Sequence, residues 1–403
     1  MDDSSAPIGS PSPGAATDAA PGAAIDAARR RGLRFVGLAS ACVGFALVLQ
    51  MCLNSNFLVG EIHVSGFQAG ALEAVRESCG IWAFGILALL AGIAEPAIAT
   101  LVLVLFALGL SAYSMAPTYG AVMLMSVVWS QGLHVWMPLP NSMTLSLAEP
   151  GRAGARLGQV QAFGAAGSAI GLALALALTL LGVPIRPLYV MAGAAALLAA
   201  VACFGIPRQV KTPASAALVF NRKYATYYLL CFLEGWHKQI ANCFAGLLLV
   251  NRYHAPLVEM IVLWAVIQLI GWFFSPRVGR LIDRVGERRI LTFYYIVLTL
   301  FFIGYATVQS RYVLYAIFVL DSASFAFATA LTTYVNKIAP KSDHTRVLSM
   351  GVAMNHVAAV SMPFIGGILW SLLGYQWAFL IGIPAAAASI VTVRRLPGHG
   401  QTT

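Results

Sequence analysis

Residues 279–289 read Gly279-Arg280-Leu281-Ile282-Asp283-Arg284-Val285-Gly286-Glu287-Arg288-Arg289, and they stand between apolar runs at about 257–276 and 290–308. The two glycines permit a tight turn and the close approach of neighbouring helices. Asp283 and the arginines offer charge-assisted hydrogen bonds. Such a charged connection between two runs of spanning length predicts a loop at the surface of a membrane.

The composition of the 403-residue chain is typical of a membrane protein. Charged residues make up 10% and hydrophobic residues 59% of it, and the mean hydropathy is +0.80, whereas a soluble protein carries about 25% charged residues. A transmembrane β-barrel would show segments of about ten residues with alternating polarity. The runs in this chain are long and continuous, so the sequence predicts an all-α membrane protein.

Twelve apolar runs have the length that a membrane-spanning helix requires, and Gly, Pro or charged residues separate them. They lie at about 35–53, 66–91, 97–114, 118–142, 155–181, 187–205, 224–250, 257–276, 290–308, 312–336, 346–369 and 376–393. We therefore expect twelve transmembrane helices.

The basic residues support this count. Arg186, Arg252 and Arg311 are expected in outer loops and Arg76 and Lys238 inside spans, while most of the other lysines and arginines fall in the alternate loops. Because cytoplasmic loops collect Lys and Arg, we expect both termini in the cytoplasm and the chain in a bacterial inner membrane. Topology accounts for the net charge of +10, so no nucleic-acid partner is expected.

The chain divides into five expected segments. Residues 1–32 and 395–403 are expected to be cytoplasmic tails, the first of them disordered because its Ala, Pro, Gly, Ser and Asp residues show no apolar periodicity. The polar stretch 206–223 is an expected interdomain loop, and it separates two six-helix bundles at 33–205 and 224–394. Two bundles of equal size predict an internal repeat.

The stretch at 279–289 resembles the signature G-x-x-x-D-R-x-G-R-R of the major facilitator superfamily, with Glu287 as the one departure. The resemblance covers about 33–394. It implies two parallel six-helix bundles, a central site between them and a rocking, alternating-access mechanism. It also implies a gating role for the matching residues, which are Gly279, Asp283, Arg284, Gly286, Arg288 and Arg289.

The same resemblance implies that Asp283 faces the positive N-terminal end of the fifth span, near Arg152, when the cytoplasmic gate is closed. The corresponding loop of the first half reads Gly92-Ile93-Ala94-Glu95-Pro96 and lacks the arginines. We therefore expect an asymmetric gate.

Ionisable residues inside the predicted spans are candidate site residues, because burying a charge in a span costs at least ~2.5–3.5 kcal/mol. They are Glu73, Arg76 and Glu77 in the second span, His134 in the fourth, Glu234, His237 and Lys238 in the seventh, Asp321 in the tenth and His356 in the eleventh.

Three interpretations of these residues stay open. The spacings Glu73 to Arg76 and Glu234 to Lys238 place each pair on one helix face, where the two charges can neutralise each other. Alternatively, Arg76 and Lys238 bind an anionic or zwitterionic substrate while Glu234 or Asp321 takes a proton.

A transition metal is the third interpretation. Imidazole and carboxylate suit such ions, and His237, His356, Glu234 and Asp321 could converge on one. No metal or other cofactor is otherwise expected, since the six cysteines contain no C-x-x-C pair.

The sequence thus predicts a secondary active transporter of a small solute, coupled to protons and acting as a monomer in the lipid bilayer. It predicts no enzyme, because no P-loop, nucleophile constellation or cofactor fingerprint occurs. Two alternatives remain, a transition-metal transporter and a non-transporting sensor or assembly factor on the same fold. No motif assigns the substrate, the direction of transport or the coupling ion.

Overall fold

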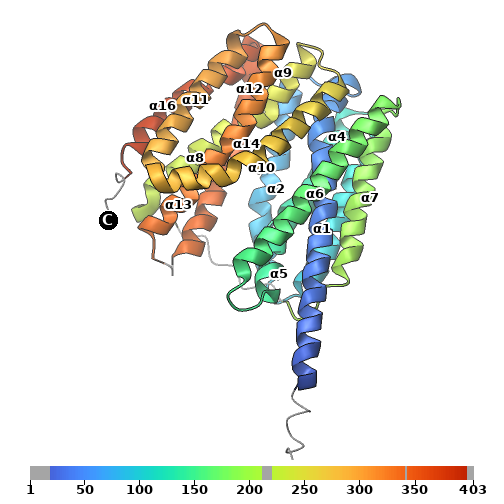
Figure 1. Cartoon of the computed structure of the whole chain (residues 1–403). Helices are drawn as coiled ribbons and strands as arrows, with labels where there is room; N and C mark the ends of the chain where they lie inside the picture. Colours follow the sequence, from blue (N-terminus) through green and yellow to red (C-terminus); the bar gives the residue numbers. More distant parts are fainter. Residues whose placement is uncertain (1–18, 211–219, 341–342, 397–403) are drawn as a thin grey trace, which may run out of the picture.

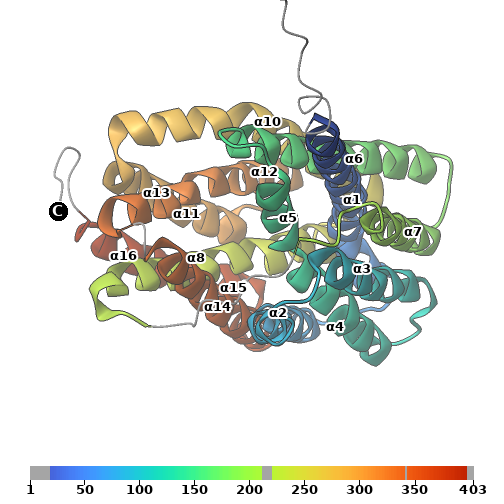
Figure 2. The same ribbon diagram turned by 90° about the horizontal axis from the view of Figure 1, so that it is seen from below.

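The structure is a computed structural model that describes residues 19–210, 220–340 and 343–396. Helices make up nearly all of these residues, and they contain no β-strand. Figures 1 and 2 show the helices of the first half on one side of the molecule and those of the second half on the other. The all-α fold class is confirmed.

The first half contains seven α-helices within its described residues. They are α1 (Ala19–Gly60), α2 (Gly66–Leu89), α3 (Glu95–Ala112), α4 (Tyr119–Trp136), α5 (Leu139–Leu147), α6 (Ala153–Leu180) and α7 (Ile185–Cys203).

The second half repeats the arrangement with more interruptions. Its α-helices are α8 (Ala225–Ile240), α9 (Gly246–Asn251), α10 (Leu257–Val285), α11 (Glu287–Thr307), α12 (Arg311–Ser324), α13 (Thr329–Ile338), α14 (His344–Leu373), α15 (Tyr375–Leu380) and α16 (Gly382–Val393). A π-helical segment, η3 (Ala241–Ala245), joins α8 to α9, and a 3-10 segment, η4 (Phe325–Ala328), joins α12 to α13.

Ten helical segments in the described residues are long and apolar enough to cross a membrane. The two other predicted spans correspond to α2 and to the continuous stretch α8–η3–α9. Both of these helices carry several charged residues in their middle. The two helices that look least like membrane spans are therefore the ones with the most candidate site residues.

The N-terminal helix is longer than expected. Helix α1 begins at Ala19, so our expectation of a disordered tail over 1–32 is wrong for residues 19–32, and residues 1–18 lie outside the described residues. Alanine favours helix, and an existing helix extends without a new nucleus. Asp26 and Arg29 add an ion pair of 3.8 Å one turn apart. Most of the expected loop 206–223 also lies outside the described residues, and the domain boundaries remain predictions.

Helices α2 and α14 join the two halves through close contacts at glycine. A Cβ at Gly70 would lie 2.1 Å from the carbonyl oxygen of Pro363, and a Cβ at Gly367 would lie 3.0 Å from that of Gly66. The backbone N–H of Phe67 donates to the hydroxyl of Ser371 at 3.0 Å. The halves are thus tied together where α2 begins and α14 ends, away from the end of the molecule at which α1 begins (Figure 1).

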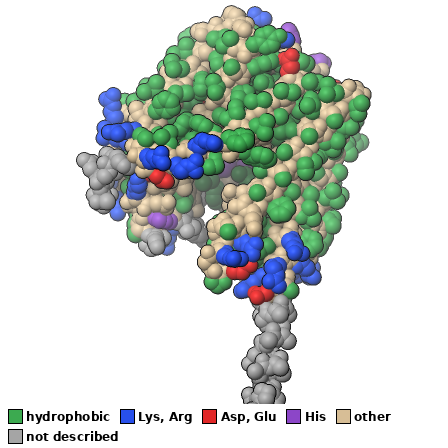
Figure 3. Space-filling model, in the orientation of Figure 1, with side chains coloured by type: hydrophobic (Ala, Val, Ile, Leu, Met, Phe, Trp, Pro, Cys, Tyr) green, Lys and Arg blue, Asp and Glu red, His purple; other side chains and the backbone are tan. Residues whose placement is uncertain are grey.

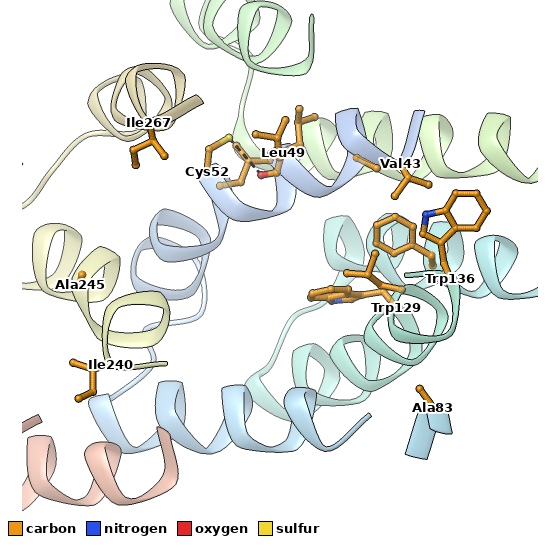
Figure 4. Close-up of a cluster of buried hydrophobic side chains, with 14 of the residues drawn as sticks. Val43, Leu49, Cys52, Ala83, Trp129, Trp136, Ile240, Ala245 and Ile267 are labelled. Atoms are coloured by element: carbon orange, nitrogen blue, oxygen red, sulfur yellow. Dashed lines mark hydrogen bonds between the residues drawn. The ribbon is translucent and has the colours of Figure 1, made fainter. Parts of the chain in front are cut away.

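The buried core continues across both halves. Figure 4 shows part of it, with Val43, Leu49 and Cys52 on α1 and Trp129 and Trp136 on α4. The Cys52 thiol donates to the Leu49 carbonyl oxygen at 3.4 Å. This packing fixes the helices that carry the candidate site.

The signature stretch is mostly helical, because α10 continues to Val285. Gly286 has a φ of +88°, which favours glycine. Asp283 is exposed and forms no ion pair within the described residues, so the expected contact near Arg152 is not made in this conformation. Glu287, the residue that departs from the signature, forms an ion pair: its Oε2 lies 2.8 Å from Lys337 Nζ.

The first half has a similar turn between its second and third spans, but different residues form it. Gly92 has a φ of +84°, and Glu95 at the start of α3 is 1% exposed. The hydroxyl of Ser142 on α5 donates to Glu95 Oε1 at 2.6 Å. In both halves a glutamate at the positive end of the third span thus accepts a hydrogen bond from the end of the fourth.

Candidate functional site

A cavity of about 470 Å³ lies between the two halves. Figure 3 shows a hollow between them, on the side that carries many of the exposed lysines and arginines. Six of the nine candidate site residues line it, namely Arg76, Glu77, His134, Glu234, Lys238 and His356. The volume is in the range of small-molecule sites.

The charges of α2 form one cluster. Arg76 pairs with Glu73 and also lies 3.5 Å from Glu77, measured from Nη2 to Oε1. The Arg76 guanidinium lies over the Trp129 ring, 5.3 Å from its centroid, a cation–π arrangement. The predicted neutralising pair Glu73–Arg76 is therefore present, and Arg76 is held between two carboxylates and an aromatic face.

Arg76 also borders two spaces, as do Gln50, Met51 and Asn242. A second pocket, of about 80 Å³, is lined by Glu73 and Arg76 together with Asn54 and Ser55 of α1. Arg76 lines the larger cavity as well. A change in the Arg76 side chain would therefore alter the boundary between the cavity and the smaller pocket.

His134 of α4 is oriented by one residue. Its Nδ1 lies 2.9 Å from the backbone oxygen of Ser130 and 3.0 Å from the Ser130 hydroxyl. Its Nε2 lies 4.0 Å from Glu77 Oε2.

His356 of α14 approaches the same carboxylate from the second half. Its Nδ1 lies 3.7 Å from Glu77 Oε2, and the ring centroids of His134 and His356 are 5.3 Å apart. Gly80 makes room for this imidazole, because a Cβ at that position would lie 2.3 Å from His356 Cε1. Glu77 thus stands between two imidazoles from different halves.

The seventh span presents Glu234 and Lys238 to the cavity. Glu234 does not pair with Lys238 in this structure; its Oε1 accepts a hydrogen bond of 2.9 Å from the hydroxyl of Tyr294. Lys238 is exposed to the cavity and forms no ion pair within the described residues. The predicted neutralising pair of this span is therefore absent, and Lys238 is available to a ligand.

His237 and Asp321 lie away from the cavity. His237 is fully buried between the rings of Tyr295 and Phe302, and Asp321 is 1% exposed and accepts a hydrogen bond of 3.1 Å from Tyr305. A helix turns by about 100° per residue, so His237 points away from its neighbour Lys238.

The predicted metal set of His237, His356, Glu234 and Asp321 is therefore wrong. In the described residues the groups that could hold an ion are Glu77, His134 and His356.

The sequence interpretation missed several lining residues. Asn242 lies in the π-helical segment η3 and lines both the cavity and the smaller pocket. Gln50 and Trp129 also line the cavity. Gln50 could have been noticed as a polar residue inside an apolar run, whereas nothing in the sequence signals a π-helical turn, which is common at functional sites.

Comparisons with known proteins agree with the all-α membrane fold. A sequence model described as "Major Facilitator Superfamily" matches residues 36–328 and 227–402. The "Multidrug resistance protein MdtG" of Serratia proteamaculans (strain 568) is 31% identical over 108 residues. That match covers 27% of this chain and 26% of the relative.

Solved structures share the fold at low sequence identity. A mutant of the nucleoside transporter NupG superposes with a TM-score of 0.76 at 14% identity, covering 90% of this chain and 99% of the other. A mutant of the peptide transporter POT gives 0.71 at 12% identity, covering 91% and 93%. A bacterial homologue of the human lysosomal transporter Spinster, inward-facing and unoccupied, gives 0.65 at 14%, covering 91% and 95%.

Proposed function

This chain belongs to the major facilitator superfamily, and on that premise we propose that it is a secondary active transporter of a small organic anion or zwitterion in a bacterial inner membrane. The observation that carries the proposal is the cavity between the halves, which Arg76 lines from α2 and Lys238 from α8. A basic residue from each half suits a ligand with a carboxylate or a similar anionic group.

Alternating access is supported by the unequal closure of the two ends. Asn56 Nδ2 donates to the Ala255 carbonyl oxygen at 2.9 Å, and Phe67 bonds Ser371 across the halves. At the opposite end Asp283 is exposed. We propose that this end is cytoplasmic and that rocking of the halves exchanges the open and closed ends.

Proton coupling is assigned to Glu234. Its Oε1 is bonded to Tyr294, while its Oε2 is buried without a hydrogen-bond partner in the structure. A buried carboxylate with one unpaired oxygen is costly when charged, and protonation lowers that cost. Asp321 lies outside the cavity lining, so we no longer expect it to take the transported proton.

The substrate test starts from the purified protein. A thermal-shift screen against organic acids, amino acids, nucleosides and dipeptides finds compounds that stabilise the fold by mass action, and each is then tested for counterflow in proteoliposomes. Lys238→Gln is expected to weaken the affinity by ~10-fold, the usual size of one charged contact. Lys223→Gln, whose ammonium lies over the Tyr224 ring outside the cavity, is the matched control.

Two results would contradict the proposal. Binding of a compound without any counterflow would favour the sensor or assembly-factor alternative, because such a protein binds without net movement. Equal affinities of the Lys238→Gln and Lys223→Gln variants would remove Lys238 from the site.

The coupling test compares the two carboxylates of the second half. Glu234→Gln is expected to abolish the dependence of uptake on an imposed pH gradient while counterflow continues. Asp321→Asn is expected to keep that dependence. The coupling role falls if uptake by Glu234→Gln still follows the pH gradient.

A further inference from the structure

One carboxylate oxygen of the cavity faces two imidazole nitrogens without a hydrogen bond between them. Glu77 Oε2 lies 3.7 Å from His356 Nδ1 and 4.0 Å from His134 Nε2. One potential ligand atom from each of Glu77, His134 and His356 lies within 4.8 Å of the other two. Three potential ligand atoms thus surround a common point in the cavity.

The tautomer of His134 follows from its other nitrogen. The backbone oxygen of Ser130 can only accept, so Nδ1 at 2.9 Å carries the hydrogen. The Ser130 hydroxyl donates to the backbone oxygen of Arg76 at 2.9 Å, which leaves it to accept from Nδ1 as well. In the neutral ring Nε2 therefore presents a lone pair toward Glu77, as metal-binding histidines do when a carbonyl fixes their other nitrogen.

Glu77 Oε2 and His134 Nε2 face each other at 4.0 Å, and both are hydrogen-bond acceptors. This arrangement is unfavourable unless a cation or a proton lies between the two atoms. His356 Nδ1 faces the same carboxylate oxygen and is also buried without a hydrogen-bond partner in the structure. We propose that Glu77 Oε2, His134 Nε2 and His356 Nδ1 form a binding site for a divalent transition-metal ion.

The distances suit such an ion after a small closure. Bonds of about 2.1 Å place neighbouring ligand atoms about 3–3.5 Å apart around a tetrahedral or octahedral ion. The observed 3.7 and 4.0 Å exceed this by less than the width of an atom. Two imidazoles and one carboxylate favour Zn²⁺, Co²⁺ or Fe²⁺ over Mg²⁺ and Ca²⁺, which prefer oxygen ligands.

The nearby Arg76 does not occupy the carboxylate oxygen that would bind the ion. Arg76 contacts Glu77 through Oε1 and is also paired with Glu73, so the oxygen that faces the imidazoles is separate from the one that faces the guanidinium. Lys238 lines the same cavity, so a bound ion would leave an excess of positive charge there. An anionic ligand in an open coordination position of the ion would offset it.

The inference deepens the proposed function and rests on it, because the ion would connect the protein to the anionic substrate. His356 belongs to α14, whereas Glu77 and His134 belong to α2 and α4. Binding of one ion by residues of both halves would therefore favour the approach of the halves around the substrate.

The test measures ion binding directly. Full-length protein, purified without a polyhistidine tag and stripped with a chelator, is titrated with Co²⁺ and followed by its visible absorption, and with Zn²⁺ followed by thermal shift. We expect one saturable site with nitrogen and oxygen ligands and no thiolate charge-transfer band. His356→Gln and His134→Gln should each weaken binding by at least ~10-fold.

His254→Gln is the matched control, since His254 is exposed outside the cavity, and it should bind like the unchanged protein. Glu77→Gln provides a third variant if one histidine variant does not fold. The inference is overturned if folded His356→Gln binds Co²⁺ as tightly as the control, or if the unchanged protein binds neither ion.

These outcomes are distinct from those of the transport test. Solute counterflow that persists in excess chelator, together with no ion binding, removes the metal site and keeps the transporter. Saturable Co²⁺ binding that His356→Gln weakens, with no counterflow of any solute, supports the site and removes the transporter.

Discussion

Two acidic side chains buried inside the helices, one in each half of the molecule, have different surroundings. In the first half Glu73 is 6% exposed and pairs with the guanidinium of Arg76. In the second half Asp321 is 1% exposed and has a tyrosine hydroxyl as its partner. A guanidinium stabilises a charged carboxylate. A buried carboxylate whose partner is a neutral donor is less well stabilised when charged, so its protonation costs less free energy. The pair on α2 is thus suited to keep its charges, and Asp321 of α12 is suited to lose its charge.

The largest expected effect comes from breaking the charged cluster. Arg76→Gln leaves Glu73 and Glu77 buried without their cation, and removing one partner of a buried pair costs ~3–5 kcal/mol. We expect a corresponding fall in the free energy of unfolding, measured in mixed detergent micelles. The double variant Glu73→Gln/Arg76→Gln should recover much of the loss. A double variant as unstable as Arg76→Gln would show that the pair is not the cause.

A smaller effect is expected where the halves touch. Gly70→Ala places a Cβ 2.1 Å from the backbone oxygen of Pro363 on α14, and overpacking of this kind costs ~1–3 kcal/mol. Gly85→Ala on the same helix has no heavy atom within 4 Å and should be neutral or stabilising, because alanine is the better helix former. Thermal unfolding of the two variants compares them directly. Equal melting temperatures would contradict the close contact of α2 with α14.

The tyrosine partner in the second half gives the next effect. Tyr305→Phe removes the hydroxyl that donates to Asp321 Oδ2 and should lower the free energy of unfolding by ~1–2 kcal/mol. Asp321→Asn keeps an acceptor for Tyr305 and should cost less. The comparison between the halves would fail if Tyr305→Phe destabilised the protein as much as Arg76→Gln.

The smallest effect concerns an ion pair between Glu149, in the loop before α6, and Arg156 in the first turn of α6. The Arg156 guanidinium donates to Glu149 at 2.6 Å and lowers the pKa of Glu149 from its usual 4.5 to about 2. Because the pKa is lower in the folded state, the stabilisation is present above about pH 4.5 and is lost as the pH falls toward 2. Between pH 6 and pH 3 the melting temperature of Glu149→Gln should fall slightly less than that of the unchanged protein. Parallel curves would contradict the pair's contribution.

The sequence was sufficient to predict the fold and the six ionisable residues named above that line the cavity. Long apolar runs and the stretch at 279–289 predicted the helices, and the cost of intramembrane charge identified Arg76, Glu77 and Lys238, which line the cavity. It could not predict which way each residue faces. A membrane helix that is apolar all round has no polar stripe to orient it. Nothing in the sequence therefore distinguished His237 and Asp321, which lie outside the cavity lining, from Glu234, which is part of it.

Contacts between the halves were beyond the sequence for a related reason. Glu77 and His356 are far apart in the chain, and their approach depends on how α2 packs against α14 through Gly70 and Gly80. The prediction for the N-terminal segment was wrong for another reason. Composition alone indicated disorder, whereas α1 already begins at Ala19. Local composition says little about a segment that is attached to a formed helix.

The charges around the two pockets have an electrical consequence. The acidic lining residues are Glu73, Glu77 and Glu234, and the basic ones are Arg76 and Lys238. With Glu234 protonated and the histidines neutral, these five groups sum to zero. Each elementary charge carried across the bilayer exchanges about 2.3 kcal/mol with a potential of 100 mV. We expect the empty, protonated carrier to reorient without sensing the membrane voltage, so that current in a voltage-clamped bilayer would arise from the steps that carry substrate.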